Sequence, residues 1–449
     1  MLHDICQTPV NLHTQDAMTD WNAMTLAFLS HGKTTPQHLG AVLAAEPGFA
    51  QGHAAKGLFS MMMGRAELVG VAREAALAAR AALSSGDGAD RDRLWTEALE
   101  AWIDGFPTHS IEKIEELLHR FPQDTLSAKV SHAIRFILGD NKGMRRSIEA
   151  VLAAHGPDHP CRGYLLGCHA FSLEETGDYH AAERAGLEGL TFAPDDAWGL
   201  HAVAHVYDMT GQPDRGIGLI ESNCSAWDHC NNFRYHVWWH KALLHLDRGE
   251  IDTALQLYDT QIREDKSDDY RDIANATSLL VRLELEGLAV GDRWEELADL
   301  AENRIDDGCV VFADLHYMLA LANAGRSKKQ AALQARFAMD ARRTGDMNKR
   351  VANPGVAALV GLNAFAEGRY DTAFRNLAAA RATMQTIGGS HAQRDVFDRM
   401  TIDAGLRAGL ADGAQAILEE RIALRDGIED RFAATRLADL AEMRRIPAQ

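Results

Sequence analysis

A glycine that recurs at nearly regular intervals constrains the fold of this 449-residue chain more than any other feature. Many of these glycines follow an apolar segment with helical periodicity and precede a second, alanine-rich helical segment. Glycine takes the left-handed conformation that ends a helix, and small alanine side chains let two helices pack closely. The glycines are 34 to 43 residues apart and stand at positions 64, 105, 139, 177, 211, 249, 287, 325, 368 and 409. The pattern therefore predicts a series of helix pairs, each joined by a glycine turn.

A repeat of this length is typical of tetratricopeptide-like solenoids. We expect an all-α, right-handed superhelix of about nine or ten helix pairs, in which the first helix of each pair lines the concave surface. Residues 1–47 fit the period less well and are predicted to form an N-terminal helical cap. Residues 48–449 are predicted to form one continuous solenoid domain.

Composition restricts the partners and the compartment. The net charge of -18 argues against a nucleic-acid surface and against an anionic membrane face. The six cysteines form no CxxC motif, which favours a reducing compartment. The first 20 residues lack the basic and apolar regions of a signal peptide, and no run of about 18 apolar residues predicts a membrane helix. We expect a cytoplasmic protein that binds neither nucleic acid nor membrane.

Two histidine pairs are the strongest candidates for chemistry. His201 and His205 are four residues apart, as are His236 and His240, so each pair lies on one face of a predicted first helix. Imidazoles on facing helices can ligate a divalent metal such as Zn²⁺. The same four residues can act as catalytic bases or bind a ligand without metal. They can also be structural, bonded to one another or to the backbone in a packed polar seam.

A second group of candidates begins at a predicted helix start near the C-terminus. Gly388 and Gly389 provide a turn, and Ser390 is a good N-cap residue. The first turn of a helix suits an anion, so we expect a carboxylate or phosphate beside the next residues. His391 and Asp395, four apart, are candidates for catalysis, and Gln393 and Arg394 for ligand binding. The alternative is a buried ion pair of Arg394 and Asp395 with a neighbouring repeat.

Three further residues are candidates for ligand binding. Asp208 lies near His205, and His316 is favoured over Asp314 because residues two apart on a helix face different directions. Trp239 either packs between repeats or forms a stacking wall for a ligand.

The chain resembles the tetratricopeptide repeat protein 38 family. The stretches that carry the resemblance include His201-Ala202-Val203-Ala204-His205, His236-Val237-Trp238-Trp239-His240 and Ile387-Gly388-Gly389-Ser390-His391-Ala392-Gln393-Arg394-Asp395-Val396-Phe397. The resemblance implies an α-helical repeat and no settled activity. The family usually has Glu at the position of Asp208 and Asp at that of Asn275.

Three functions follow from these patterns. The leading hypothesis is a concave, histidine-rich pocket that binds a small polar or anionic ligand or a short peptide, as a metal- or His-dependent hydrolase-like enzyme. The alternative is a non-catalytic scaffold that docks a partner protein in its groove. The third is that the histidines are structural and the outer face carries the function. The sequence leaves a homodimer open.

Overall fold

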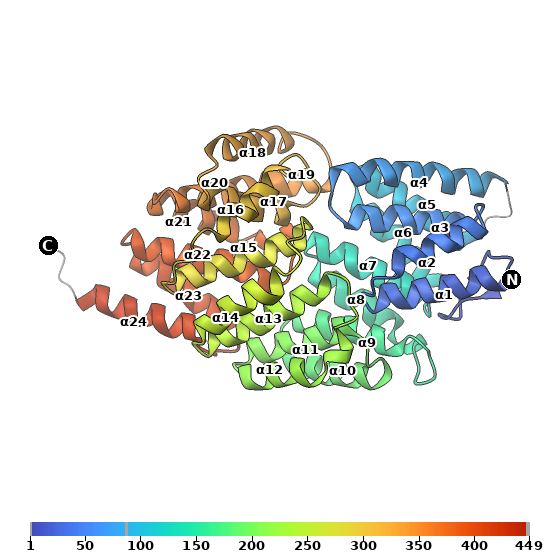
Figure 1. Cartoon of the computed structure of the whole chain (residues 1–449), viewed down its shortest axis with the longest axis horizontal. Coiled ribbons are helices and arrows are strands. Elements are labelled where there is room, and N and C mark those ends of the chain that lie inside the picture. The colour runs from blue at the N-terminus through green and yellow to red at the C-terminus, as the bar shows by residue number, and fades with distance from the viewer. Residues whose placement is uncertain (1, 86–88, 446–449) are drawn as a thin grey trace. The chain divides into compact units, whose positions relative to one another are not determined.

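This computed structural model describes residues 2–85 and 89–445, and these are almost entirely α-helical (Figure 1). Each of the ten repeat glycines stands between two helices, with φ between 64° and 92°. Side chains with a Cβ rarely adopt this conformation, so glycine is the residue that lets the chain turn there. The predicted all-α helical repeat is confirmed.

The chain divides into two compact units. Unit 1 comprises Met1–Val203, Asn223–Arg234 and Thr344–Asp346, and unit 2 comprises Ala204–Ser222, Tyr235–Arg343 and Met347–Gln449. Three of the five divisions fall within helices α11, α13 and α19, and the other two follow Ser222 and Arg343. The predicted boundary after residue 47 lies in the turn between α2 and α3. The separate cap and the single continuous solenoid stay predictions.

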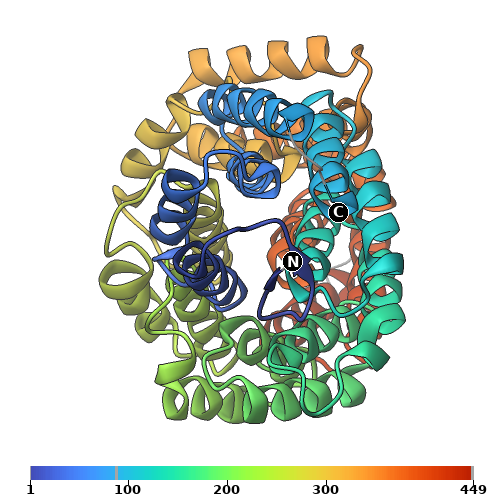
Figure 2. The same ribbon diagram turned by 90° about the vertical axis from the view of Figure 1, so that its right-hand side faces the viewer.

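Unit 1 begins with a short antiparallel hairpin, seen as dark blue arrows in Figure 2, in which Leu2 pairs with Val10. Asp4, between the two strands, forms a buried ion pair with Arg91 of α5. The elements are β1 (Leu2–His3), β2 (Pro9–Val10), α1 (Gln15–Leu29), α2 (Thr35–Ala45), α3 (Ala50–Met62), α4 (Ala66–Ser85), α5 (Asp90–Ile103), α6 (Pro107–Arg120), α7 (Thr125–Leu138), α8 (Asn141–Val151), η1 (Leu152–Ala154), α9 (Arg162–Glu174), α10 (Tyr179–Phe192) and η2 (Cys224–Ala226).

The remaining elements belong to unit 2 or to the helices in which the two units divide. They are α11 (Ala197–Met209), α12 (Pro213–Ser222), α13 (Phe233–Asp247), α14 (Ile251–Leu257), η3 (Tyr258–Ile262), α15 (Tyr270–Leu285), α16 (Arg293–Glu302), α17 (Val311–Asn323), α18 (Ser327–Asp340), α19 (Asp346–Arg350), η4 (Val351–Gly355), α20 (Val356–Ala366), α21 (Tyr370–Arg381), η5 (Met384–Ile387), α22 (His391–Arg407), α23 (Ala411–Leu424) and α24 (Arg431–Arg445).

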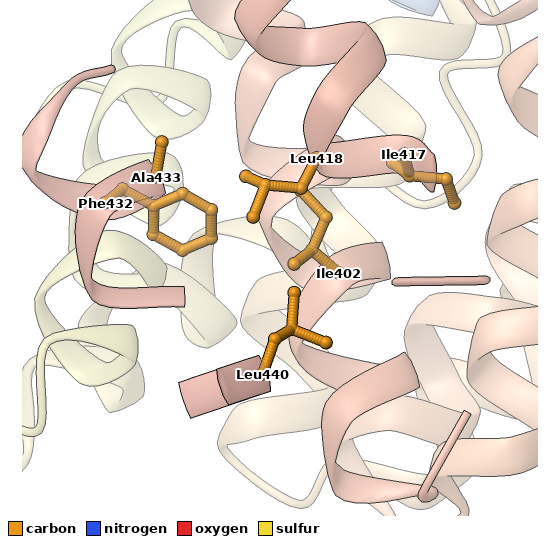
Figure 3. Packing of buried hydrophobic residues seen from close by; sticks show 6 residues of the cluster. All are labelled: Ile402, Ile417, Leu418, Phe432, Ala433 and Leu440. Atoms are coloured by element: carbon orange, nitrogen blue, oxygen red, sulfur yellow. The ribbon is translucent and has the colours of Figure 1, made fainter. Parts of the chain in front are cut away.

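The C-terminal helices of unit 2 pack around an aliphatic core. Leu418 of α23 lies among Ile402 of α22 and Phe432 and Leu440 of α24, and all four side chains are buried (Figure 3). Burial of apolar side chains of this size stabilises a fold by roughly 1.5–3 kcal/mol each. This core fixes the position of α22, whose first turn carries several of the candidate residues.

Among the described residues, we find no helix with the length and apolar character needed to span a membrane.

Candidate metal centre

Helices α11 and α13 bring three histidines together in unit 2. His205 lies on α11, and His236 and His240 lie one turn apart on α13. One nitrogen from each ring can be chosen so that all of them lie within 4.8 Å of one another. The rings of His205 and His240 have centroids 4.3 Å apart. The three imidazoles of α11 and α13 thus form a compact cluster.

The outer nitrogen of His236 is held by a side chain of α15. Its Nδ1 lies 3.0 Å from the Oδ1 atom of Asn275, a carbonyl oxygen that accepts the Nδ1 proton. The Nε2 atom of His236 therefore carries a lone pair, and the Nε2 atom of His240 lies 3.0 Å from it. Burial lowers the pKa of His236 to about 3, although the Asn275 hydrogen bond partly opposes this. The ring is neutral at physiological pH, which is the state that binds a metal.

The centre is surrounded by protein rather than by water. His205 and Trp239 have no exposed surface, and His240 is 2% exposed. The indole of Trp239 stacks on His236 with ring centroids 5.3 Å apart and meets His240 edge-on. Trp239 therefore packs against the centre, and its proposed role as a wall for a ligand stays a prediction.

The three imidazoles fit a zinc-like ion. Two nitrogens bound to one tetrahedral Zn²⁺ at about 2.0–2.1 Å lie about 3.3–3.4 Å apart. The two Nε2 atoms of α13 are 3.0 Å apart, so a shift of a few tenths of an ångström admits the ion. The Asn275 contact is the kind of outer hydrogen bond that orients a histidine ligand. With such an ion bound, three protein nitrogens would leave one position of a tetrahedral set for water or substrate.

His201 has a different environment. It lies one turn before His205 on α11 but belongs to unit 1. Its Nδ1 donates to the carbonyl oxygen of Trp198 at 3.1 Å, and its ring stacks on Phe171 with centroids 5.3 Å apart. Its assignment as a ligand or a base stays a prediction.

The first turn of α22 lies beside the centre. The half-buried ring of His391 is edge-on to that of His205, with centroids 5.3 Å apart. The Ser390 side chain and the Gln393 side chain form a capping box, which confirms the predicted helix start. Arg394 donates to the carbonyl oxygen of Gly389. Gln393 and Arg394 thus stabilise the start of α22, and their binding of a ligand stays a prediction.

Asp395 takes part in a buried ion network of α22, α23 and α24. Arg399 donates to it at 2.6 Å and Arg421 at 2.5 Å, and both arginines also bond Asp430. Burial raises the pKa of Asp395, but Arg421 and Arg399 outweigh it and hold the pKa well below its usual range. Asp395 is therefore ionised, and two guanidinium groups bind its carboxylate. This geometry matches the buried-ion-pair alternative for Asp395, and its catalytic role stays a prediction.

The remaining candidates also have structural partners. Arg425 lies 3.3 Å from the carboxylate of Asp208. His316 is buried, donates from Nδ1 to the carbonyl oxygen of Phe312 at 2.7 Å and packs against Phe397. Burial lowers its pKa to about 4. The contacts give Asp208 and His316 defined positions, and their binding of a ligand stays a prediction.

Sequence reasoning did not select Asn275 or Arg282 as site residues. Both lie on α15, seven residues or two helical turns apart, and both are buried. The available signal was their spacing, which places an Asn and an Arg on one face of the same helix.

The solved structures similar to this chain share little of its sequence. No family model matches the chain. Among solved structures, the human IFIT1 dimer with PPP-AAAA is 12% identical over 97% of this chain and 96% of that chain, with a TM-score of 0.43. The APC/C hetero-tetramer Cut9-Hcn1 is 10% identical over 96% and 94%, with a TM-score of 0.37. Yeast Tom70 is 12% identical over 96% and 89%, with a TM-score of 0.34. Similarity at this level says nothing of what this chain binds, and the absence of nucleic acid and membrane partners stays a prediction.

Proposed function

We propose that His205, His236 and His240 bind one divalent metal ion of the zinc type, and that the protein is a metal-dependent hydrolase of small polar substrates. The observation that carries the proposal is the donor set: three buried imidazole nitrogens within 4.8 Å, with the outer nitrogen of His236 already bonded to Asn275. Neutral imidazole ligands with a fixed tautomer are what a catalytic zinc site requires.

The chemistry is divided between the ion and the chain. When bound, the metal supplies a Lewis acid that polarises a carbonyl group and lowers the pKa of water. Asn275 fixes the ring of His236, and Trp239 excludes bulk water from one side. His391, next to His205, is placed to take the proton that water loses and to return it to the leaving group. The water oxygen bonds to the carbonyl carbon, and the bond to the leaving group breaks.

The test is hydrolysis of 4-nitrophenyl acetate by the full chain. We expect turnover that 1,10-phenanthroline abolishes and Zn²⁺ restores, and we expect His240→Ala to be inactive. His245→Ala is the matched control, because His245 lies on the same helix and pairs with Glu250 instead. Hydrolysis that is unaffected by chelator and by His240→Ala contradicts the proposal. The chain is then better described as a non-catalytic scaffold that docks a partner in its groove.

We also propose kinship with the tetratricopeptide repeat protein 38 family. The resemblance of residues 387–397 supports it, and this stretch forms the glycine turn, the capping box and the first turns of α22. The resemblance supplies no activity, so the hydrolase proposal rests on the three histidines alone.

A further inference from the structure

Arg282 of α15 is a buried cation whose hydrogen bonds are incomplete. It is 1% exposed, donates from Nη1 to the carbonyl oxygen of Ser278 at 3.1 Å, and donates from Nη2 to that of Ala392 at 2.7 Å. Its Nε atom has no hydrogen-bond partner within residues 2–85 and 89–445. A buried polar atom without a partner is costly and requires an explanation, of which a missing ligand is one.

The guanidinium also lacks a carboxylate of its own. Asp395 lies 3.9 Å away, and both of its oxygens are already held by Arg399 and Arg421. Burial and the nearby Arg399 lower the pKa of Arg282 to about 9, so the group remains mostly charged at neutral pH. A buried charge without a close counter-ion destabilises the protein until an anion or another partner compensates it.

The buried charges around Arg282 include an excess of one cation. Four arginines occupy the network, namely Arg282, Arg399, Arg421 and Arg425. Three carboxylates pair with these arginines, namely those of Asp208, Asp395 and Asp430. A fourth carboxyl, Asp247, lies 3.6 Å from Arg425, but burial and the neighbouring Asp208 and Asp430 raise its pKa to about 8. The raised pKa favours the neutral carboxyl group of Asp247, so four guanidinium groups face three closely paired carboxylates.

Arg282 lies beside the proposed metal centre. Its Cζ atom is 5.5 Å from the ring centroid of Trp239, and that ring contacts both His236 and His240. Ala392, which accepts from Arg282, follows His391 at the start of α22. The guanidinium group thus bonds the first turn of α22, and the first residue of that turn, His391, is edge-on to His205.

We propose that Arg282 binds the carboxylate group of the substrate. As a statement about substrate, this rests on the hydrolase function proposed above. The fork of a guanidinium group matches the two oxygens of a carboxylate, and one negative charge compensates the single excess cation. A phosphate carries more charge than the network lacks. The substrate class is therefore small carboxylic acids with a hydrolysable acyl bond.

The experiment measures binding to the metal-free full chain, so that it does not depend on the metal centre. The thermal midpoint is recorded in EDTA at constant ionic strength, while chloride is replaced by acetate, succinate or phosphate. We expect acetate and succinate to raise the midpoint in a saturable way, because they bind the native state only. Stabilisation by phosphate without stabilisation by carboxylates overturns the carboxylate assignment. No response to any of the three anions overturns the site.

Substitution of Arg282 separates binding from general stabilisation. In Arg282→Met the uncompensated charge is gone, so the midpoint without anion should rise and the response to acetate should disappear. Arg421→Met is the matched control, because Arg421 is also buried but doubly paired, and its loss should lower the midpoint. Arg282→Lys keeps the charge without the fork, and should need several-fold more acetate for the same shift. Undiminished acetate stabilisation in both Arg282 variants overturns the proposal.

The two proposals can fail separately. If acetate stabilises the protein through Arg282 but the chain binds no metal, the anion site is supported and the hydrolase function is contradicted. If the chain binds metal but does not respond to carboxylates, the metal centre is supported and the carboxylic-acid substrate class is contradicted.

Discussion

Asn275 is the residue whose role beside the centre is most clearly defined by geometry. Its Oδ1 fixes the proton of His236 on Nδ1. We expect Asn275→Leu to weaken zinc binding by about 10- to 100-fold, since the loss of an outer hydrogen bond has that effect at histidine ligands. Competition with a chromophoric zinc chelator measures the affinity. Asn363→Leu is the control, because Asn363 is a buried asparagine of α20 bonded to Glu367. Equal zinc affinity in both variants contradicts the role.

His316 makes the stability of the protein depend on pH. Its pKa in the folded chain is about 4, below the unfolded value near 6.5, so the unfolded state binds the proton more readily. Stability is therefore lost as the pH falls below about 6.5. For this one group, the free energy of unfolding should drop by about 2 kcal/mol between pH 7 and pH 5.

The measurement is urea unfolding of the metal-free protein at both pH values. His316→Leu should reduce the difference between pH 7 and pH 5 by that amount. An unchanged difference would mean that the buried ring is not a source of acid sensitivity.

At the scale of elements, the turn before α22 has a strict requirement for glycine. Gly389 has φ of +75°, and a Cβ there would lie 2.6 Å from the ring of Phe312. Gly368 has a similar φ of +72°, but nothing lies within 4 Å of its Cβ position. Gly368→Ala should cost about 1–2 kcal/mol from backbone strain. Gly389→Ala should cost about 1–3 kcal/mol more because Phe312 must move.

Chemical denaturation of the two alanine variants measures this difference. Equal losses of unfolding free energy would show that Phe312 yields without cost. The extra loss in Gly389→Ala should be accompanied by displacement of His391, because the turn sets where α22 begins.

The pairing of helices could be read from the sequence because its signals are local. A glycine turn and helical periodicity depend on neighbouring residues, and all ten glycines have the expected conformation. The histidines of α13 form a pair for the same reason. Asn275 and Arg282 were missed because their roles depend on residues 39 and 110 positions away in the chain. The pairing of Asp395 with Arg421 of α23, 26 residues away, was equally invisible to a local pattern.

At the scale of the whole molecule, the proposed function depends on a metal centre in unit 2. The most direct measurement is titration of the metal-free protein with Co²⁺, followed by visible absorption. We predict saturation at one Co²⁺ per chain, with the intense bands of four-coordinate cobalt. Those bands should be lost in the double variant His236→Ala/His240→Ala and retained in His245→Ala. Absence of these bands in the wild-type protein, or their persistence in the double variant, would contradict the proposed metal centre.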